Sequence, residues 1–215
     1  MRHSTRRQFL EYAAASSLTA LGASLWLAGA AHAAADDVAI ADLMAEGPLP
    51  DCPEGSSDAP VTIVEYASMT CPHCAAFHVE TYPKLKSDYI DTGKARFILR
   101  EFPLDPLATA GFMLARYAGE DKRNAMIDLL FTQQKSWAYA EKKIAALASL
   151  VKQAGLTQAD FETCLKDQAL YDKVNKTRDI AAEMFKVQST PTFFINGRRH
   201  NGAFGADELA KLIVA

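Results

Sequence analysis

Hydrophobic and polar positions after residue 60 predict a strand, a helix and a second strand. The run Val61–Tyr66 is mostly apolar or β-branched, which indicates a buried strand. A helix is expected to begin near Cys71, with Pro72 in its first turn, and to kink at Pro83. A second strand is expected over residues 95–102. A helix that joins two strands in this way favours parallel pairing.

Helical periodicity dominates the middle of the chain. Helices are predicted at about residues 106–118, 121–134, 140–153, 157–165 and 168–185. Strand character returns at Thr192–Ile195, and Asn196-Gly197 predicts a hairpin turn into a strand at 198–201. A last helix is expected at 207–214 and a short one at 36–46. The pattern is that of a small α/β unit interrupted by a block of helices.

Residues 1–33 are typical of an export signal. Arg6 and Arg7, followed by Phe-Leu, resemble a twin-arginine signal. The mildly apolar stretch Ala13–Ala30 and an A-x-A motif ending at Ala33 come next, so cleavage is expected after about Ala33. The alternatives are an ordinary secretory signal and a retained membrane anchor, for which the stretch is short and weakly hydrophobic. The sequence therefore predicts a periplasmic protein.

Composition adds one exclusion. The chain has 215 residues, of which 49% are hydrophobic and 23% charged, so an ordinary globular core can form. The formal net charge of −3 becomes −5 when the signal, with its three arginines and one glutamate, is removed. This acidic balance gives no electrostatic reason to bind nucleic acid.

A C-x-x-C motif carries the predicted chemistry. Cys71 and Cys74 lie at the expected helix start, where unpaired N–H groups and the helix dipole stabilise a thiolate. The two sulfurs share one face and can bond to each other. Cys71, nearer the helix end, is the predicted attacking thiol, and Cys74 the resolving one. Pro72 and His73 between them are expected to tune the redox potential.

Two other interpretations of the motif stay open. It can be half of a zinc site, with His73 or His78 as further ligands, although the chain has no second C-x-x-C. It can also be a structural disulfide, although so small a loop would stabilise little. Redox chemistry without a metal or other cofactor is favoured, and His78 is expected to be a partly exposed helix residue.

Two segments resemble a known family. Residues 64–74 (VEYASMTCPHC) and 189–197 (STPTFFING) are similar to those of DsbA-type periplasmic thiol oxidases of the thioredoxin superfamily. The resemblance covers roughly residues 58–215 and implies an α/β thioredoxin fold with an inserted α-helical domain. The implied parts are an N-terminal extension at 34–60, thioredoxin-like segments at 61–104 and 188–215, and a helical insertion at 105–187.

The same resemblance implies roles for three further residues. Pro191 is the cis-proline that faces the dithiol, and Thr190 contributes backbone contacts to a substrate chain beside Cys71. Glu65 matches the buried acidic residue that helps proton transfer to and from Cys74. The alternative for Glu65 is an edge or surface position.

The two remaining cysteines are less defined. Both follow the predicted signal, and disulfides persist in oxidising compartments. A structural disulfide between Cys52 and Cys164 is one hypothesis, and buried or free thiols are the alternative.

The predicted function is donation of the Cys71–Cys74 disulfide to reduced or unfolded exported proteins. By resemblance, a membrane quinone-linked partner reoxidises the protein, which is expected to be a monomer. The alternatives are a reductase or isomerase of periplasmic disulfides, which the redox potential would separate, and a redox-inert chaperone on a thioredoxin scaffold. A chaperone would keep its function after a Cys71→Ser substitution.

Overall fold

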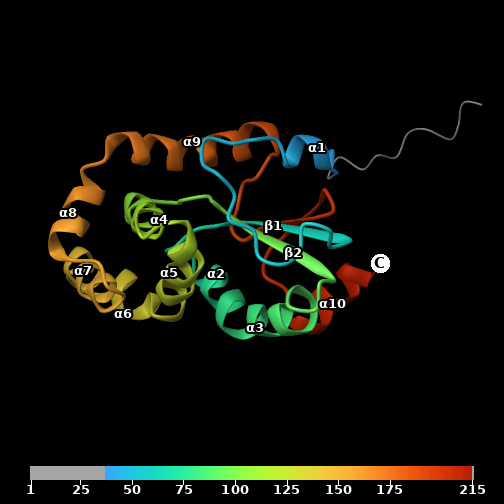
Figure 1. Ribbon diagram of the computed structural model, residues 1–215, viewed down its shortest axis with the longest axis horizontal. Helices are drawn as coiled ribbons and strands as arrows, with labels where there is room; N and C mark the ends of the chain where they lie inside the picture. The colour runs from blue at the N-terminus through green and yellow to red at the C-terminus, as the bar shows by residue number, and fades with distance from the viewer. Residues whose placement is uncertain (1–36, 215) are drawn as a thin grey trace, which may run out of the picture. The chain divides into compact units, whose positions relative to one another are not determined.

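A computed structural model describes residues 37–214, apart from the side chain of residue 214. The predicted signal, its twin-arginine motif and its cleavage site lie outside the described residues. The described strands form one sheet in the order β2-β1-β3-β4 (Figure 1). They are β1 (Val61–Ala67), β2 (Ala95–Glu101), β3 (Thr192–Ile195) and β4 (Arg198–Asn201). The pair β1 and β2 is parallel, with Val61 opposite Ala95, and the other two pairs are antiparallel.

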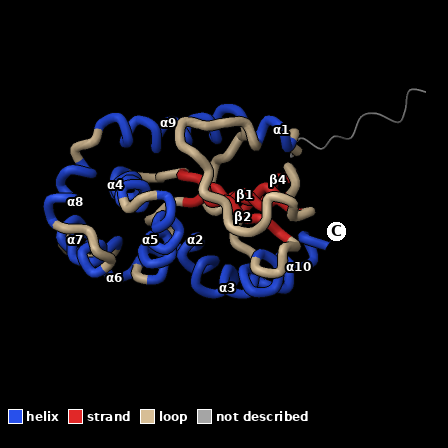
Figure 2. Tube along the Cα trace, in the orientation of Figure 1, coloured by secondary structure: helices blue, strands red, loops and turns tan. Residues whose placement is uncertain are grey.

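Helices surround this sheet and fill the chain between β2 and β3 (Figure 2). Before β2 they are α1 (Ile40–Leu43), α2 (Pro72–Ala76), the π-helical turn η1 (Phe77–Thr81), α3 (Tyr82–Leu85) and the π-helical turn η2 (Lys86–Ile90). The later ones are α4 (Pro106–Tyr117), α5 (Glu120–Thr132), α6 (Gln134–Ala138), α7 (Lys143–Gln153), α8 (Gln158–Leu165), α9 (Gln168–Met184) and α10 (Ala206–Val214). Within the described part of the chain, no helix combines the length and apolar character needed to cross a membrane.

Strand β1 is buried on both faces. Its successive side chains point to opposite sides of the sheet and enter two different core clusters. Val64 and Tyr66 belong to a core cluster that Leu43 of α1 and Phe185, just after α9, complete. Ile63 and Ala67 belong to the larger cluster that contains the dithiol cysteines and most of the helices. Glu65 shares the face of Ile63 and Ala67, so its carboxylate points towards the dithiol side of the sheet.

The predicted strand–helix–strand unit and the C-terminal hairpin are confirmed. Asn196 and Gly197 both have positive φ, at 47° and 89°, as a tight two-residue hairpin turn requires. The helix after the dithiol is expected to have a single kink at Pro83, but it contains two π-helical turns, η1 and η2. Since Pro83 has no N–H to bond one turn back, the backbone widens into η1 before α3 begins.

Two helix predictions differ from the structure. The helix expected at 36–46 is only the single turn α1. The helix expected at 140–153 begins at Lys143, and a separate short helix, α6, precedes it. Helix α6 is too short to show periodicity, and it forms around the fully buried Trp137, whose indole N–H donates to the Leu130 carbonyl at 2.8 Å.

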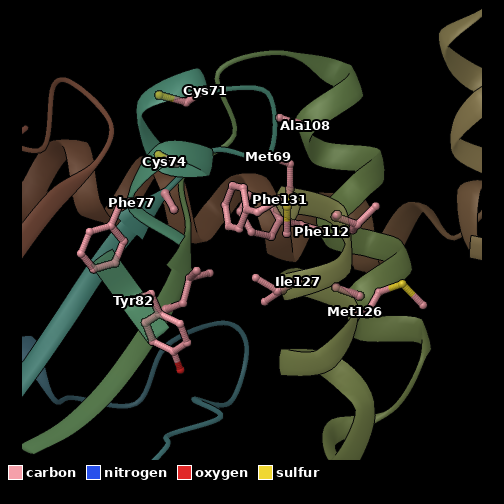
Figure 3. Packing of buried hydrophobic residues seen from close by; sticks show 14 of the residues in the cluster. Met69, Cys71, Cys74, Phe77, Tyr82, Ala108, Phe112, Met126, Ile127 and Phe131 are labelled. Atoms are coloured by element: carbon pink, nitrogen blue, oxygen red, sulfur yellow. The ribbon is translucent and has the colours of Figure 1, made fainter. Parts of the chain in front are cut away.

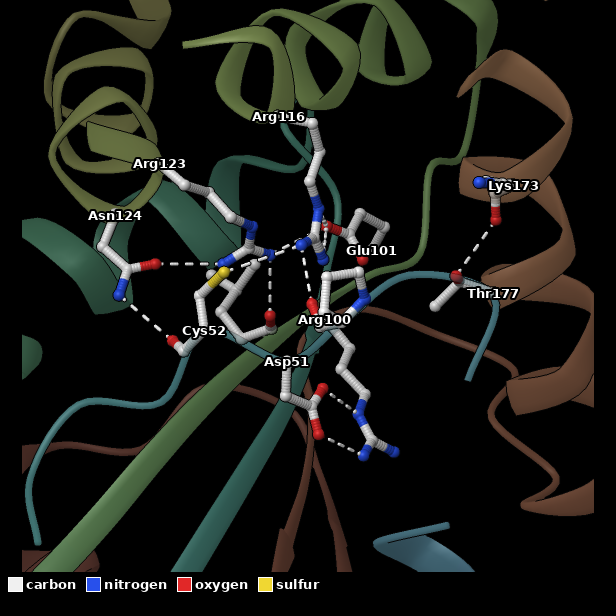
Figure 4. A network of polar contacts seen from close by, with 11 residues as sticks. Asp51, Cys52, Arg100, Glu101, Arg116, Arg123, Asn124, Lys173 and Thr177 are labelled. Carbon is white, nitrogen blue, oxygen red and sulfur yellow. Dashed lines mark hydrogen bonds and ion pairs between the residues drawn. The ribbon is translucent and has the colours of Figure 1, made fainter. Parts of the chain in front are cut away.

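Ion pairs link the end of β2 to the segment before β1 and to helices α4 and α5 (Figure 4). The Arg100 guanidinium donates to both carboxylate oxygens of Asp51, at 2.9 and 2.7 Å. Next to it, Glu101 is 1% exposed and accepts from Arg116 and Arg123, each at 2.8 Å. Burial opposes the charge on Glu101, but the two guanidinium groups outweigh it and lower the pKa of that carboxyl.

Candidate active site

Cys71 is the N-cap residue of α2, with an extended backbone at φ −76° and ψ 120°. Strand β1 delivers the chain to this position through a short loop, and Pro72 occupies the first helical turn. Figure 3 shows Cys71 and Cys74 above the apolar core, on the first turn of the helix. Cys71 is 5% exposed and Cys74 is fully buried.

Gln134 of α6 holds the loop that carries Cys71. Its buried side-chain amide donates to the carbonyl of Met69 at 2.8 Å and to that of Cys71 at 2.9 Å. Sequence reasoning missed this residue, and no local signal could have found it, because a glutamine at a helix end has no distinguishing pattern. The helical block therefore supplies a direct support for the dithiol.

The surroundings divide the roles of the two thiols. A hydrogen bond from the Cys74 thiol lowers the pKa of Cys71 to about 5, against the opposing effect of burial. Thr190 and the backbone N–H groups of Cys74 and His73 add to this lowering. The pKa of Cys74 is raised well above its usual value by burial, by the bond to Cys71 and by the charge of Glu65. Cys71 is therefore the thiolate at neutral pH, and Cys74 keeps its proton.

Pro72 and His73 contribute to the surroundings of Cys71 through the backbone. Pro72 begins the helix, and His73 adds its backbone N–H to the donors around Cys71. The His73 side chain is exposed.

Thr190 and Pro191 face the dithiol, as the resemblance implied. The peptide bond between them is cis. The Cys71 thiol donates to the Thr190 carbonyl at 3.2 Å, although the two residues lie 119 positions apart in the chain. The Thr190 hydroxyl is buried and has no hydrogen-bond partner among the described residues.

Glu65 and His78 form a buried pair beneath the dithiol. Glu65 lies on the central strand β1 with no exposure, so the edge or surface alternative is wrong. The expectation of a partly exposed His78 is also wrong, because its side chain is 3% exposed and its Nε2 lies 2.9 Å from Glu65 Oε2. The π-helical turn carries His78 on the inner face of the helix, where a charged carboxylate compensates its burial. Burial alone would lower the pKa of His78, but Glu65 and then Asp128 raise it to about 9.

Cys52 and Cys164 are both free thiols, so the hypothesised disulfide between them is absent from the structure. Cys52 receives a hydrogen bond from Arg116 at 3.6 Å, whereas Cys164 is fully buried in α8. Tyr117, the next residue on α4, points to Asp160 of α8 instead. The two thiols therefore lie in different surroundings, Cys52 beside Arg116 and Cys164 inside the core.

A zinc site at the C-x-x-C motif would need further ligand side chains close to the two cysteines. Among residues 37–214, no three His, Cys, Asp or Glu side chains gather closely enough to hold a metal ion.

The fold and the site together define a class of protein. A dithiol at the start of a helix after a central strand, facing a cis-proline before the neighbouring strand, is the arrangement of thioredoxin-fold dithiol proteins. The model of a family described as thioredoxin matches residues 50–215. The chain belongs to this family, in its DsbA-like group.

Known relatives support this placement. The chain is 33% identical over 169 residues to disulfide bond formation protein D of Bacillus cereus, covering 74% of this chain and 75% of that protein. It is 32% identical over 144 residues to a Rickettsia bellii protein described as a protein-disulfide oxidoreductase, covering 66% and 56%. The chain thus spans about half the length of the Rickettsia relatives.

A solved structure shows the same architecture. The crystal structure of alpha-DsbA1 of Wolbachia pipientis has a TM-score of 0.73 and 31% identity, covering 80% of this chain and 93% of that one. The expected fold class, an α/β thioredoxin fold with an inserted helical domain, is confirmed.

Proposed function

We propose that this protein is a periplasmic thiol:disulfide oxidoreductase that donates the Cys71–Cys74 disulfide to reduced exported proteins. The observation that carries the proposal is the asymmetry of the dithiol. The pKa of Cys71 is lowered to about 5, while that of the fully buried Cys74 is raised. A thiolate stabilised in the reduced protein makes the disulfide form a stronger oxidant, which favours oxidation of clients over their reduction.

The reaction follows from this asymmetry. A client thiolate attacks Cys71 Sγ, the Cys71–Cys74 bond breaks, and its electron pair leaves on Cys74. A second client thiolate then attacks the client sulfur of the mixed disulfide, and the electron pair leaves on Cys71. The low pKa of Cys71 makes it a good leaving group, so this second step is fast. The client gains a disulfide, and the protein gains two electrons and, at neutral pH, one proton, which Cys74 holds while Cys71 stays a thiolate.

An apolar groove beside Cys71 is suited to hold the client chain. It has a volume of about 760 Å³ and runs from Pro72 to the loop before α4 and the start of α7. Its apolar side chains include Leu104, Tyr139 and Ile144, all more than half exposed. Side chains of many shapes can pack against such a surface, which suits a protein with many unfolded clients. The Thr190 carbonyl, 3.2 Å from Cys71 Sγ, is suited to pair with an extended chain.

The cellular setting is part of the proposal. The twin-arginine-like motif and the A-x-A site support export and cleavage after about Ala33. Family membership supports the need for a reoxidising partner, which we propose to be quinone-linked and in the membrane. An oxidising compartment is where a disulfide donor is useful.

The test is oxidation of a reduced two-cysteine peptide by the oxidised protein, followed by mass. We expect turnover with wild type and with Cys52→Ser, and none with Cys71→Ser. The redox potential of the Cys71–Cys74 pair should lie well above the roughly −270 mV of thioredoxin, towards the roughly −120 mV of the strongest oxidants in the superfamily. A potential near that of thioredoxin would favour the reductase alternative. Absence of Cys71-dependent peptide oxidation in the wild type would favour the redox-inert chaperone.

A further inference from the structure

Between the buried Cys74 and solvent lies a row of three ionisable side chains. Glu65 of β1 is fully buried, and its charge acts on Cys74. His78 lies next, with Nε2 2.9 Å from Glu65 Oε2. Asp128 of α5 follows, with Oδ1 3.8 Å from His78 Nδ1 and a side chain that is 52% exposed. The row therefore begins at a sulfur with no access to water and ends at a carboxylate that water reaches.

We propose that His78 and Asp128 form the route by which protons pass between Glu65 and solvent. This inference rests on the proposed disulfide-exchange function, since each turnover must load and unload a proton at Cys74. An imidazole suits the middle position because it can accept a proton at one nitrogen while it releases one at the other.

The atoms that such a route needs are unoccupied by other contacts. Glu65 Oε1 and His78 Nδ1 are buried and have no hydrogen-bond partner among the described residues. Buried polar atoms without partners are uncommon, and one explanation for them is a part in catalysis. Oε1 is free to exchange a proton with Cys74 while Oε2 stays on His78. Nδ1 is free to reach Asp128 directly or through one water molecule.

Aromatic rings keep the middle of the route dry. The His78 ring stacks on Phe131 at a centroid distance of 4.3 Å and lies 5.4 and 5.1 Å from the rings of Phe77 and Tyr82. Figure 3 shows these three aromatic side chains below the dithiol. This packing leaves the His78 side chain 3% exposed, so the imidazole offers a shielded path for a proton between Glu65 and Asp128.

The titratable groups packed around His78 come from three elements. They are Glu65 of β1, Asp128 of α5 and the Tyr82 hydroxyl of α3, which donates to Glu54 at 2.5 Å. Because two carboxylates flank it, His78 holds its proton at neutral pH and can supply it.

Each half of the cycle moves one proton along this row. When the client thiolate attacks Cys71, Cys74 leaves as a thiolate and takes the proton that protonated His78 passes to it through the Glu65 carboxylate. Asp128 then relays a proton from solvent to the neutral His78, so Glu65 is again a carboxylate and His78 is again protonated. During reoxidation the same proton leaves in the opposite direction, from the Cys74 thiol through Glu65 and His78 to Asp128.

The test is the rate of client-peptide oxidation across pH, with its solvent deuterium isotope effect. The variants are His78→Gln, which keeps a donor for Glu65 but cannot relay a proton, and Asp128→Asn, which changes a half-exposed residue. Asp121→Asn, an exposed carboxylate at the start of the same helix, is the matched control. Because general acid–base groups contribute about 10²–10⁴-fold, we expect His78→Gln to slow oxidation by at least about 10²-fold. Asp128→Asn should slow it less, and added small buffers should restore part of its rate.

Three outcomes decide the matter. Slowed oxidation with an increased isotope effect in both variants, and a wild-type profile for Asp121→Asn, supports the route. Wild-type pH profiles and isotope effects in Asp128→Asn and His78→Gln overturn it, even if His78→Gln is less stable. Failure of the proposed function is distinguishable from either, because the wild type itself would then show no Cys71-dependent turnover.

Discussion

The low pKa of Cys71 is assigned mainly to one hydrogen bond, so its removal is the sharpest perturbation of the site. Cys74→Ala deletes the thiol that donates to the Cys71 thiolate, whereas Cys74→Ser leaves a hydroxyl in its place. A hydrogen bond to a charged group contributes about 1.5–3 kcal/mol, which corresponds to a rise of about 1–2 in the pKa of Cys71 when it is lost.

The size of the whole effect follows from the two protonation states. A thiol pKa of about 5 instead of 9 stabilises the reduced protein, and this stabilisation is complete above pH 9 and disappears as pH falls through 5. At about pH 7 it amounts to roughly 2.7 kcal/mol, or about 60 mV of oxidising power.

The assay is the ultraviolet absorbance of the thiolate in reduced protein, titrated from acid to neutral pH. Cys52→Ser is the background, since Cys164 is fully buried and burial raises its pKa to about 12. The midpoint should stay near 5 in Cys74→Ser and rise in Cys74→Ala. An unchanged midpoint in Cys74→Ala would refute the assignment and leave Thr190 and the backbone donors as the cause.

Three further predictions concern the support of the site and the fold. Glu101→Gln should cost about 3–5 kcal/mol in urea unfolding, because two buried guanidinium groups lose their partner. Since the pKa of Glu101 is depressed, its contribution in the wild type is present above its ordinary value of 4.5 and is lost as pH falls below it. Gln134→Ala should cost about 1–3 kcal/mol in thermal unfolding and slow peptide oxidation, because two buried carbonyls near Cys71 lose their donor. Gly93→Ala should cost about 1–2 kcal/mol for its positive φ, and Gly197→Ala more, because its Cβ would also meet a backbone oxygen.

Each of these has a result that would contradict it. A Glu101→Gln variant with wild-type stability would mean that the arginines find other partners. Full peptide-oxidation activity in Gln134→Ala would mean that the helical block does not support the dithiol through this side chain. Equal losses of stability in the two glycine variants would mean that the Val38 carbonyl oxygen, which a Cβ at Gly197 would meet, adds no cost.

Most of the scaffold around the dithiol was predictable, because its signals are local. The β-branched run of β1, the proline after Cys71 and the Asn196-Gly197 turn each specify backbone geometry within a few residues. The positions of Pro191 and Glu65 came from resemblance to a family, and the structure places both near the cysteines as expected. The helical block was predicted in outline, except for α6, which is too short to show a period.

The sequence by itself determined the strands, most of the helices and a thiolate-stabilising helix start at Cys71. Only the tertiary structure decided what surrounds the two sulfurs. The Thr190 carbonyl, 119 positions away, and the Gln134 amide, 63 positions away, reach Cys71 through packing of the sheet and the helical block. His78 looked like a surface residue because its burial depends on a π-helical turn and on the carboxylate of a neighbouring strand. Period and propensity report local backbone geometry, whereas burial and charge pairing depend on which segments the fold brings together.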